Sequence, residues 1–318
     1  MNLNKNTTQL TESAVMAAVM ALLYYIGITL FPIFILFFPV PFVVLGIKQN
    51  MRASMSAHIV SGLILFLLTD PITTVAVFIT VGLIGASFVS LIKSKQSTTT
   101  IMIWTSLAAI IAMIVLILLG SLVTGINFKT DVQNYMTLMR TELVESFAQM
   151  PQFAKSNMDM ETLIDQTLNA AKNMIPTSII VIAVIMTYAS YWASLMILRK
   201  MKYLQREIPQ FSRFRLPKQL FVPLMVLGII AYVAGDVSFL NGEAIKLNLI
   251  FLFTFFFLIQ GIAVLMFKFE KSGMANPLKW VIAGVIFVSG FIHPIIVGIG
   301  VLDSIIDLRK IRIKRRED

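Results

Sequence analysis

IMIWTSLAAIIAMIVLILLGSLV, residues 101–123, contains no charged side chain and no proline. A helix needs about 20 mainly apolar residues to cross the hydrocarbon core of a bilayer, so this segment is long enough to span it. The 318-residue chain shares this character, with 58% hydrophobic and 13% charged residues and a mean hydropathy of +0.86. Soluble globular chains have about half apolar and a quarter charged residues. The sequence therefore predicts an all-α, polytopic transmembrane protein.

Other apolar segments of similar length flank this one, and several begin at a proline, which suits the first turn of a helix. Together with residues 101–123 they make eight predicted full spans: 13–31, 32–47, 53–69, 71–92, 176–198, 220–240 and 247–267 are the others. After Pro277 an apolar stretch is interrupted by Ser289, Gly290, His293 and Pro294. This stretch is too long for one plain helix, so we expect a C-terminal broken hairpin, either re-entrant or made of two short helices.

The basic residues predict the topology. If the N-terminus is cytoplasmic, 21 of the 26 Lys and Arg residues fall on the cytoplasmic side. Cytoplasmic loops of membrane proteins carry such an excess of Lys and Arg. We therefore expect both termini in the cytoplasm and a multi-pass protein of the cell (plasma) membrane. The net charge of +10 then reflects topology in the lipid bilayer, and we expect no nucleic-acid partner.

Four regions follow from this arrangement. Residues 1–125 form a five-helix membrane region, and 126–175 form an extracytoplasmic insert. Residues 176–308 form a second membrane region with a basic cytoplasmic loop at 199–218, and 309–318 form a basic cytoplasmic tail.

The insert has the pattern of an amphipathic helix, followed after Pro151 by a second short helix over 158–174. Its apolar residues recur every three or four positions, which places them on one helix face: Val132, Met136, Met139, Leu143, Phe147 and Met150. Two interpretations remain open, namely surface helices in the outer membrane interface and a lid over an outward-facing pocket.

Small side chains recur every four residues in the first predicted span. Ala14-xxx-Ala18 lies on one helix face, and Ser13-xxx-Ala17-xxx-Ala21 lies on the adjacent face. Small residues at this spacing let two helix backbones approach closely. The pattern indicates either packing inside the protein or a docking face for another membrane subunit.

The residues Thr11-Glu12-Ser13-Ala14-Val15-Met16-Ala17-Ala18 run directly into the first span, and the chain ends with Gly298-x-Gly300-x-x-Asp303-x-x-x-Asp307-x-Arg309. With these features the chain resembles the YybS-like family of uncharacterised bacterial membrane proteins, a relative of the substrate-binding (S) components of energy-coupling-factor vitamin transporters. In S components an AxxxA motif in the first helix docks on a coupling transmembrane subunit, and Ala14 and Ala18 match that motif. The resemblance implies a small-molecule ligand, with a coupling subunit and its ATPases as partners.

Ionisable groups are costly at membrane depth, so each one in or beside a span is a functional candidate. The candidates are Glu12, His58, Asp236, His293, Asp303, Asp307 and Arg309. Asp303 and Asp307 are four apart and share a helix face. Two readings are open: the pair meets basic residues of the loop 199–218 or clamps a partner, or it belongs to an internal salt-bridge network that anchors the tail.

The other candidates each have two readings. Glu12 suits a helix cap or a functional carboxylate, and His58 suits hydrogen-bonded packing or a proton relay. Asp236 belongs to a solvated turn or to an outer vestibule, and His293 is a turn residue or a functional group at the hairpin tip.

The sequence lacks the residues that metal binding and several kinds of catalysis require. The chain has no cysteine and only two histidines, so we expect no metal site, and HExxH and Walker A motifs are absent from the sequence. We expect no enzyme activity and no cofactor. The favoured reading is a protein of S-component type that binds or helps to transport a small solute, and the alternative is a membrane scaffold or regulatory partner without transport activity.

Overall fold

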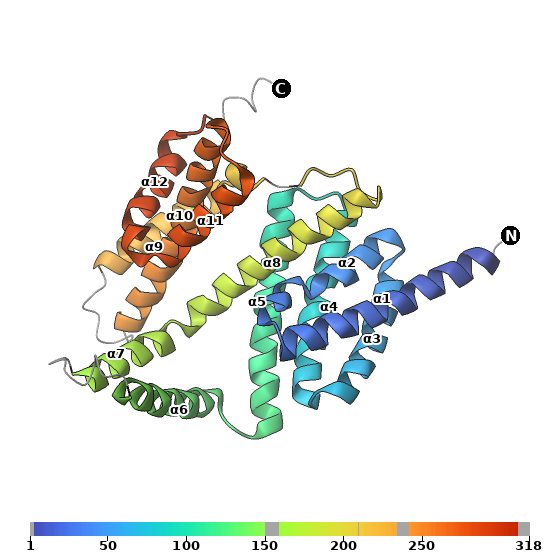
Figure 1. Ribbon diagram of the computed structural model, residues 1–318, viewed down its shortest axis with the longest axis horizontal. Coiled ribbons are helices and arrows are strands. Elements are labelled where there is room, and N and C mark those ends of the chain that lie inside the picture. The colour runs from blue at the N-terminus through green and yellow to red at the C-terminus, as the bar shows by residue number, and fades with distance from the viewer. Residues whose placement is uncertain (1–2, 150–158, 209, 234–241, 311–318) are drawn as a thin grey trace. The chain divides into compact units, whose positions relative to one another are not determined.

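The computed structural model describes residues 3–149, 159–208, 210–233 and 242–310, and every regular element in these ranges is helical (Figure 1). Contacts divide the chain into two compact units. The first unit comprises Met1–Leu138 and Ile179–Ile208, and the second comprises Met139–Ser178 and Pro209–Asp318. The sequence-based division kept 176–308 together, whereas residues 179–208 group by contacts with the N-terminal helices.

The first unit is a helical bundle, and several of its helices begin at side-chain caps. The Asp70 carboxylate accepts from the backbone N–H of Thr73, and the Ser97 hydroxyl oxygen accepts from that of Thr100, which satisfies donors left over at a helix start. Its elements are α1 (Leu3–Thr29), η1 (Pro32–Phe37), α2 (Pro39–Lys48), α3 (Met51–Leu68), α4 (Pro71–Lys93), α5 (Thr98–Thr124) and most of α8 (Ile175–Lys200).

Large side chains fill the interior of this unit. Tyr24, Phe42, Phe88 and Tyr191 are all 0% exposed. A Cβ at Gly85 would lie 2.5 Å from the Phe42 ring, so glycine is needed where α4 passes this ring.

The second unit is built around a long helix, α10. Its elements are α7 (Met160–Asn173), η2 (Phe211–Arg213), α9 (Lys218–Val233), α10 (Gly242–Lys271), α11 (Asn276–Val288), η4 (Gly290–Ile292) and α12 (His293–Ile306), and α6 (Phe128–Ala148) runs from the first unit into the second. Helices α10 and α12 touch backbone to backbone: a Cβ at Gly261 would lie 2.0 Å from the Ile296 carbonyl oxygen, and one at Gly300 would lie 2.0 Å from the Phe257 carbonyl oxygen.

Six described helices are long and apolar enough to cross a membrane, instead of the eight full spans predicted. The segment 32–47 divides into a 3-10 helix and the short helix α2, because Pro39 and Pro41 lack the N–H donors that a continuous helix requires. The segment 220–240 gives a shorter apolar helix, Leu220–Ile230 within α9, and residues 234–241 lie outside the described part of the chain.

The C-terminal apolar stretch is broken where the sequence predicts it. Asn276–Val288 and Gly290–Ile306 form a pair bent by 85°. His293 lies at the bend, with Nε2 at 3.1 Å and 3.0 Å from the carbonyl oxygens of Ile286 and Phe287. The imidazole therefore satisfies carbonyls at the end of α11, and the two halves meet near a right angle rather than running antiparallel.

Candidate functional site

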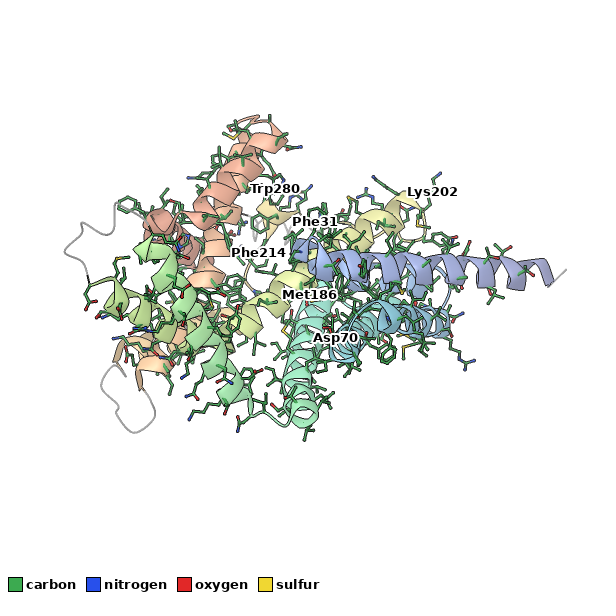
Figure 2. All side chains as sticks on the ribbon, turned by 60° about the horizontal axis from the view of Figure 1, so that its bottom comes forward. Phe31, Asp70, Met186, Lys202, Phe214 and Trp280 are labelled. Atoms are coloured by element: carbon green, nitrogen blue, oxygen red, sulfur yellow. The ribbon has the colours of Figure 1, made fainter. Side chains whose placement is uncertain are left out.

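The two small-residue faces of α1 have different environments. Ala17 and Ala21 are 2% and 4% exposed and lie in the core of the first unit. Ala14 and Ala18 are exposed, and the N-terminal turns of α1 extend past the ends of α2 and α3 (Figures 1 and 2). Packing inside the protein therefore explains the Ala17/Ala21 face but leaves the Ala14/Ala18 face uncovered.

Glu12 ties the start of α1 to the end of α2. Its carboxylate accepts from Lys48 Nζ at 2.8 Å and from Gln49 Nε2 at 3.0 Å. Gln49 Nε2 also donates to the carbonyl oxygen of Gln9 at 3.2 Å. The cap reading of Glu12 is wrong, because α1 already begins at Leu3 and Glu12 lies more than two turns into the helix. The carboxylate holds the N-terminal part of α1 against the end of α2.

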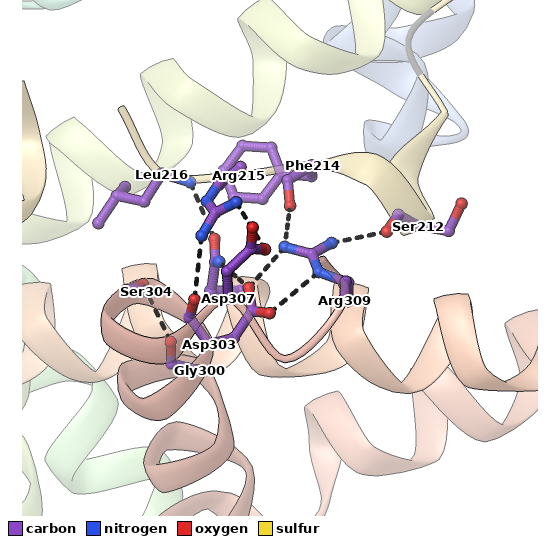
Figure 3. Close-up of polar contacts among 10 residues, drawn as sticks. Ser212, Phe214, Arg215, Leu216, Gly300, Asp303, Ser304, Asp307 and Arg309 are labelled. Carbon is purple, nitrogen blue, oxygen red and sulfur yellow. Dashed lines mark hydrogen bonds and ion pairs between the residues drawn. The ribbon is translucent and has the colours of Figure 1, made fainter. Parts of the chain in front are cut away.

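Asp303 and Arg309 form a buried ion pair in the second unit (Figure 3). Arg309 Nη2 donates to Asp303 Oδ2 at 2.7 Å and Nε donates to Oδ1 at 3.3 Å, with side-chain exposures of 1% and 0%. Arg309 also donates to the carbonyl oxygens of Ser212 at 2.6 Å and Phe214 at 2.8 Å. The guanidinium thus holds the loop after Pro209 against the end of α12.

A second ion pair extends this network. Arg215 Nη1 donates to Asp307 Oδ1 at 2.8 Å, and Arg215 Nη2 donates to the carbonyl oxygen of Asp303 at 3.1 Å. Asp307 lies just after α12 with a φ of +58°, a conformation that ends helices. Both carboxylates of the predicted pair therefore meet arginines, one from the loop 199–218 and one from the tail. This is the internal network that the sequence offered as one alternative.

Gln260 completes the network, and sequence reasoning missed it. Its Nε2 donates to Asp303 Oδ2 at 2.5 Å, and its Oε1 accepts from the backbone N–H of Leu216 at 2.8 Å. The one signal was an amide deep inside the apolar run 247–267, whose other amide, Asn248, lies near its start. The negative charges of the two carboxylates are balanced by the positive charges of the two guanidiniums. This cluster therefore joins the loop, α10 and α12. Its members are Ser212–Leu216, Gln260, Asp303, Asp307 and Arg309.

His58 lies in the interior of the first unit, at 1% exposure. Its ring stacks on Phe78 with centroids 4.6 Å apart, and Nε2 lies 3.0 Å from the Phe78 carbonyl oxygen. Nδ1 is 3.4 Å from the Tyr24 hydroxyl. Both ring nitrogens have partners, which is the hydrogen-bonded packing that the sequence gave as the alternative to a proton relay. Asp236 lies outside the described residues.

The insert is held to α10 at its C-terminal end. Asn248 on α10 donates to the Asn173 carbonyl oxygen at 2.6 Å and accepts from the Thr177 hydroxyl at 2.6 Å. Ile164 and Leu168 on α7 are 5% and 8% exposed. The second short helix of the insert is therefore present as α7, and it packs in the second unit.

Helix α6 presents the predicted apolar stripe. The stripe residues within the described range are half-buried, whereas Tyr135 and Leu138 off the stripe are 61% and 64% exposed. Arg140 joins α6 to α7 by ion pairs to Asp165 at 2.6 Å and Glu161 at 2.9 Å. The hydrogen bonds that Arg140 donates to Asp165 and Glu161 raise the pKa of its guanidinium above the ordinary value.

Within the described ranges, no three His, Asp or Glu side chains gather as metal ligands do. No curated protein and no solved structure matches this chain. A family model described as predicted membrane protein (DUF2232) matches residues 14–304. The matched range runs from Ala14 to Ser304, so it includes Ala17, Ala18, Ala21 and Asp303. The chain therefore belongs to the DUF2232 family of predicted membrane proteins.

Proposed function

We propose that this protein is a membrane subunit that binds or helps to transport a small solute, and that it docks on a partner membrane helix through Ala14 and Ala18. The proposal rests on the observation that α1 has a buried face with Ala17 and Ala21 and an exposed face with Ala14 and Ala18. A helix face of small residues lets a second backbone approach closely.

The contacts of Glu12 support this role. Its bonds to Lys48 and Gln49 hold the start of α1 against the end of α2, so the docking face has a fixed orientation before a partner arrives. Such pre-organisation lowers the ordering cost of association. The similarity of residues 11–18 to the start of S components supports a coupling transmembrane subunit as the partner.

The chain contains no Walker A motif, so in this proposal the energy for transport comes from ATPases bound to the coupling subunit. The protein itself contributes solute binding and docking, and the proposal gives it no catalytic step.

The test is a pair of substitutions on α1 with a matched control. Ala14→Leu with Ala18→Leu fills the docking face, whereas Val19→Leu enlarges a residue that is 45% exposed on a different face of the same helix. We expect the double variant to lose at least about 90% of the co-purified partner, because a bulky side chain keeps the backbones apart. Full recovery of the partner with the double variant would refute docking at this face.

A scaffold or regulatory role is the second candidate, and one observation favours it. Arg199, Lys200 and Lys202 at the end of α8 are exposed, which leaves a basic cluster for an acidic protein surface. The triple change to glutamate is expected to release a protein partner from native membranes while membrane insertion is unchanged. Unaltered co-purification of all partners would exclude this cluster as the contact.

A further inference from the structure

The middle of α8 carries hydroxyl side chains that are buried inside the first unit. Thr187, Ser190 and Ser194 are each 0% exposed and lie three or four residues apart, which places them on one helix face. Ala183 and Leu198, also 0% exposed, continue this face at both ends. A hydroxyl strip, Thr187–Ser190–Ser194, is thus bounded by apolar residues on a buried face.

Contacts inside the protein explain only one of these hydroxyls. Ser190 Oγ donates to the carbonyl oxygen of Leu36 at 2.6 Å. Neither Thr187 Oγ1 nor Ser194 Oγ has a hydrogen-bond partner among the residues that the structure describes. A buried polar group without a partner costs about 1–3 kcal/mol, and native proteins pair nearly all such groups. Two unmatched hydroxyls on one face indicate a ligand that pairs with them.

The segment that Ser190 contacts is irregular. Leu36 belongs to η1, which ends at Phe37 just before α2 begins at Pro39. Irregular backbone at membrane depth occurs where protein covers it or where it lines a cavity. In transporters, solutes bind near the bilayer midplane beside broken helices, and Thr187 lies at the middle of the 26-residue α8.

The surroundings determine the class of ligand. None of the buried polar residues described in the first unit is Asp, Glu, Lys or Arg; they are Ser54, His58, Ser61, Thr74, Thr105 and the α8 strip. An ion in this interior would lack a counter-charge, which is costly. Phe88 stacks on Tyr191 beside the strip with centroids 5.8 Å apart, so an apolar ring surface accompanies the hydroxyls.

We propose that the hydroxyl strip on α8 binds a small, uncharged polar solute. All of its side chains are fully buried, so the conformation described is the closed one and the solute enters when the first unit opens. This inference rests on the proposed solute-binding function and locates the site. It uses a different helix from the docking face, so either claim can fail alone.

The chain offers a direct test because it has no cysteine of its own. Thr187→Cys and Ser194→Cys place single thiols in the strip with little change in size. Val181→Cys is the matched control, since Val181 is 9% exposed on the same helix but lies about 120° to 180° around it from the three strip residues. Each variant is treated in native membranes with a neutral hydroxyethyl methanethiosulfonate and with a trimethylammonium one.

If the strip opens to a polar solute, the neutral reagent modifies Thr187→Cys and Ser194→Cys at least about ten times faster than Val181→Cys, since thiol reactivity requires access. The neutral reagent is also expected to outpace the cationic one at both strip positions. Complete reaction of all three variants in denaturing detergent shows that each thiol is intact. Equal rates for the strip and control thiols in membranes, whether fast or slow, would overturn the proposal.

Discussion

Asp303 and Arg309 are the most deeply buried charged partners in the described part of the second unit, with side chains 0% and 1% exposed. Removal of one partner leaves the other charge unpaired, which costs about 3–5 kcal/mol in buried pairs. We expect Asp303→Ala or Arg309→Ala alone to lower thermal stability strongly in detergent. The exposed pair of Arg140 and Glu161, with 39% and 65% side-chain exposure, is the control. Glu161→Ala is expected to change stability by less than about 1 kcal/mol.

A double-variant measurement separates this explanation from simple loss of packing. If the ion pair is the cause, Asp303→Ala combined with Arg309→Ala is less damaging than the sum of the two single changes, because the second change removes the unpaired charge. Strict additivity would contradict the ion-pair account.

At the level of residues, the sequence identified charges but not their partners. Asp303 and Asp307 stand out because carboxylates are rare next to apolar spans, and their pairing with Arg215 and Arg309 is seen in the structure. Gln260 gave no comparable signal, because its role depends on α10 and α12 meeting in three dimensions. The unmatched hydroxyl of Thr187 was equally hidden, since serine and threonine are common in membrane helices.

At the level of elements, the contact between α10 and α12 depends on Gly300. A Cβ there would lie 2.0 Å from the Phe257 carbonyl oxygen, whereas one at Gly298 on the same helix meets no atom within 4 Å. Gly300→Ala is therefore expected to destabilise the second unit by about 1–3 kcal/mol, the usual cost of overpacking. Gly298→Ala is the matched control. Equal melting temperatures for the two variants would show that α12 does not pack on α10 in this way.

The two faces of α1 make a further prediction. Ala17→Leu inserts volume into the core of the first unit, where Ala17 is 2% exposed, and is expected to cost about 1–3 kcal/mol. Ala14→Leu enlarges an exposed residue and is expected to leave thermal stability unchanged. Thermal unfolding of both variants, followed by circular dichroism in detergent, checks this, and a larger loss for Ala14→Leu would reverse the assignment of the faces.

Continuous apolar runs predicted their helices well. The predicted segments 71–92 and 101–123 appear as Pro71–Lys93 and Thr98–Thr124, because nothing in them favours another structure. The prediction of one full span over 32–47 was wrong. It relied on hydropathy, which does not register that Pro39 and Pro41 interrupt a continuous helix. The bend before α12 was predictable since Ser289, Gly290 and Pro294 interrupt the pattern, but its 85° angle depends on how the halves pack.

At the scale of the whole molecule, the excess of basic residues predicts which loops are cytoplasmic. Single cysteines test this in a chain without native ones. Lys202→Cys in the loop 199–218 should be protected from an impermeant thiol reagent added to intact cells, and Lys129→Cys at the start of the insert should react. Both positions are exposed, so access depends on the side of the membrane, and the reverse labelling pattern would invert the topology.

The central claim is that this member of the DUF2232 family acts as a subunit that docks on a coupling membrane protein. The most direct measurement is purification of the tagged wild-type chain from native membranes in mild detergent, with mass spectrometry of the proteins that co-elute. We predict recovery of a coupling transmembrane subunit and its ATPases in stoichiometric amounts. Recovery of the chain alone, or with partners that include no coupling subunit, would contradict the claim.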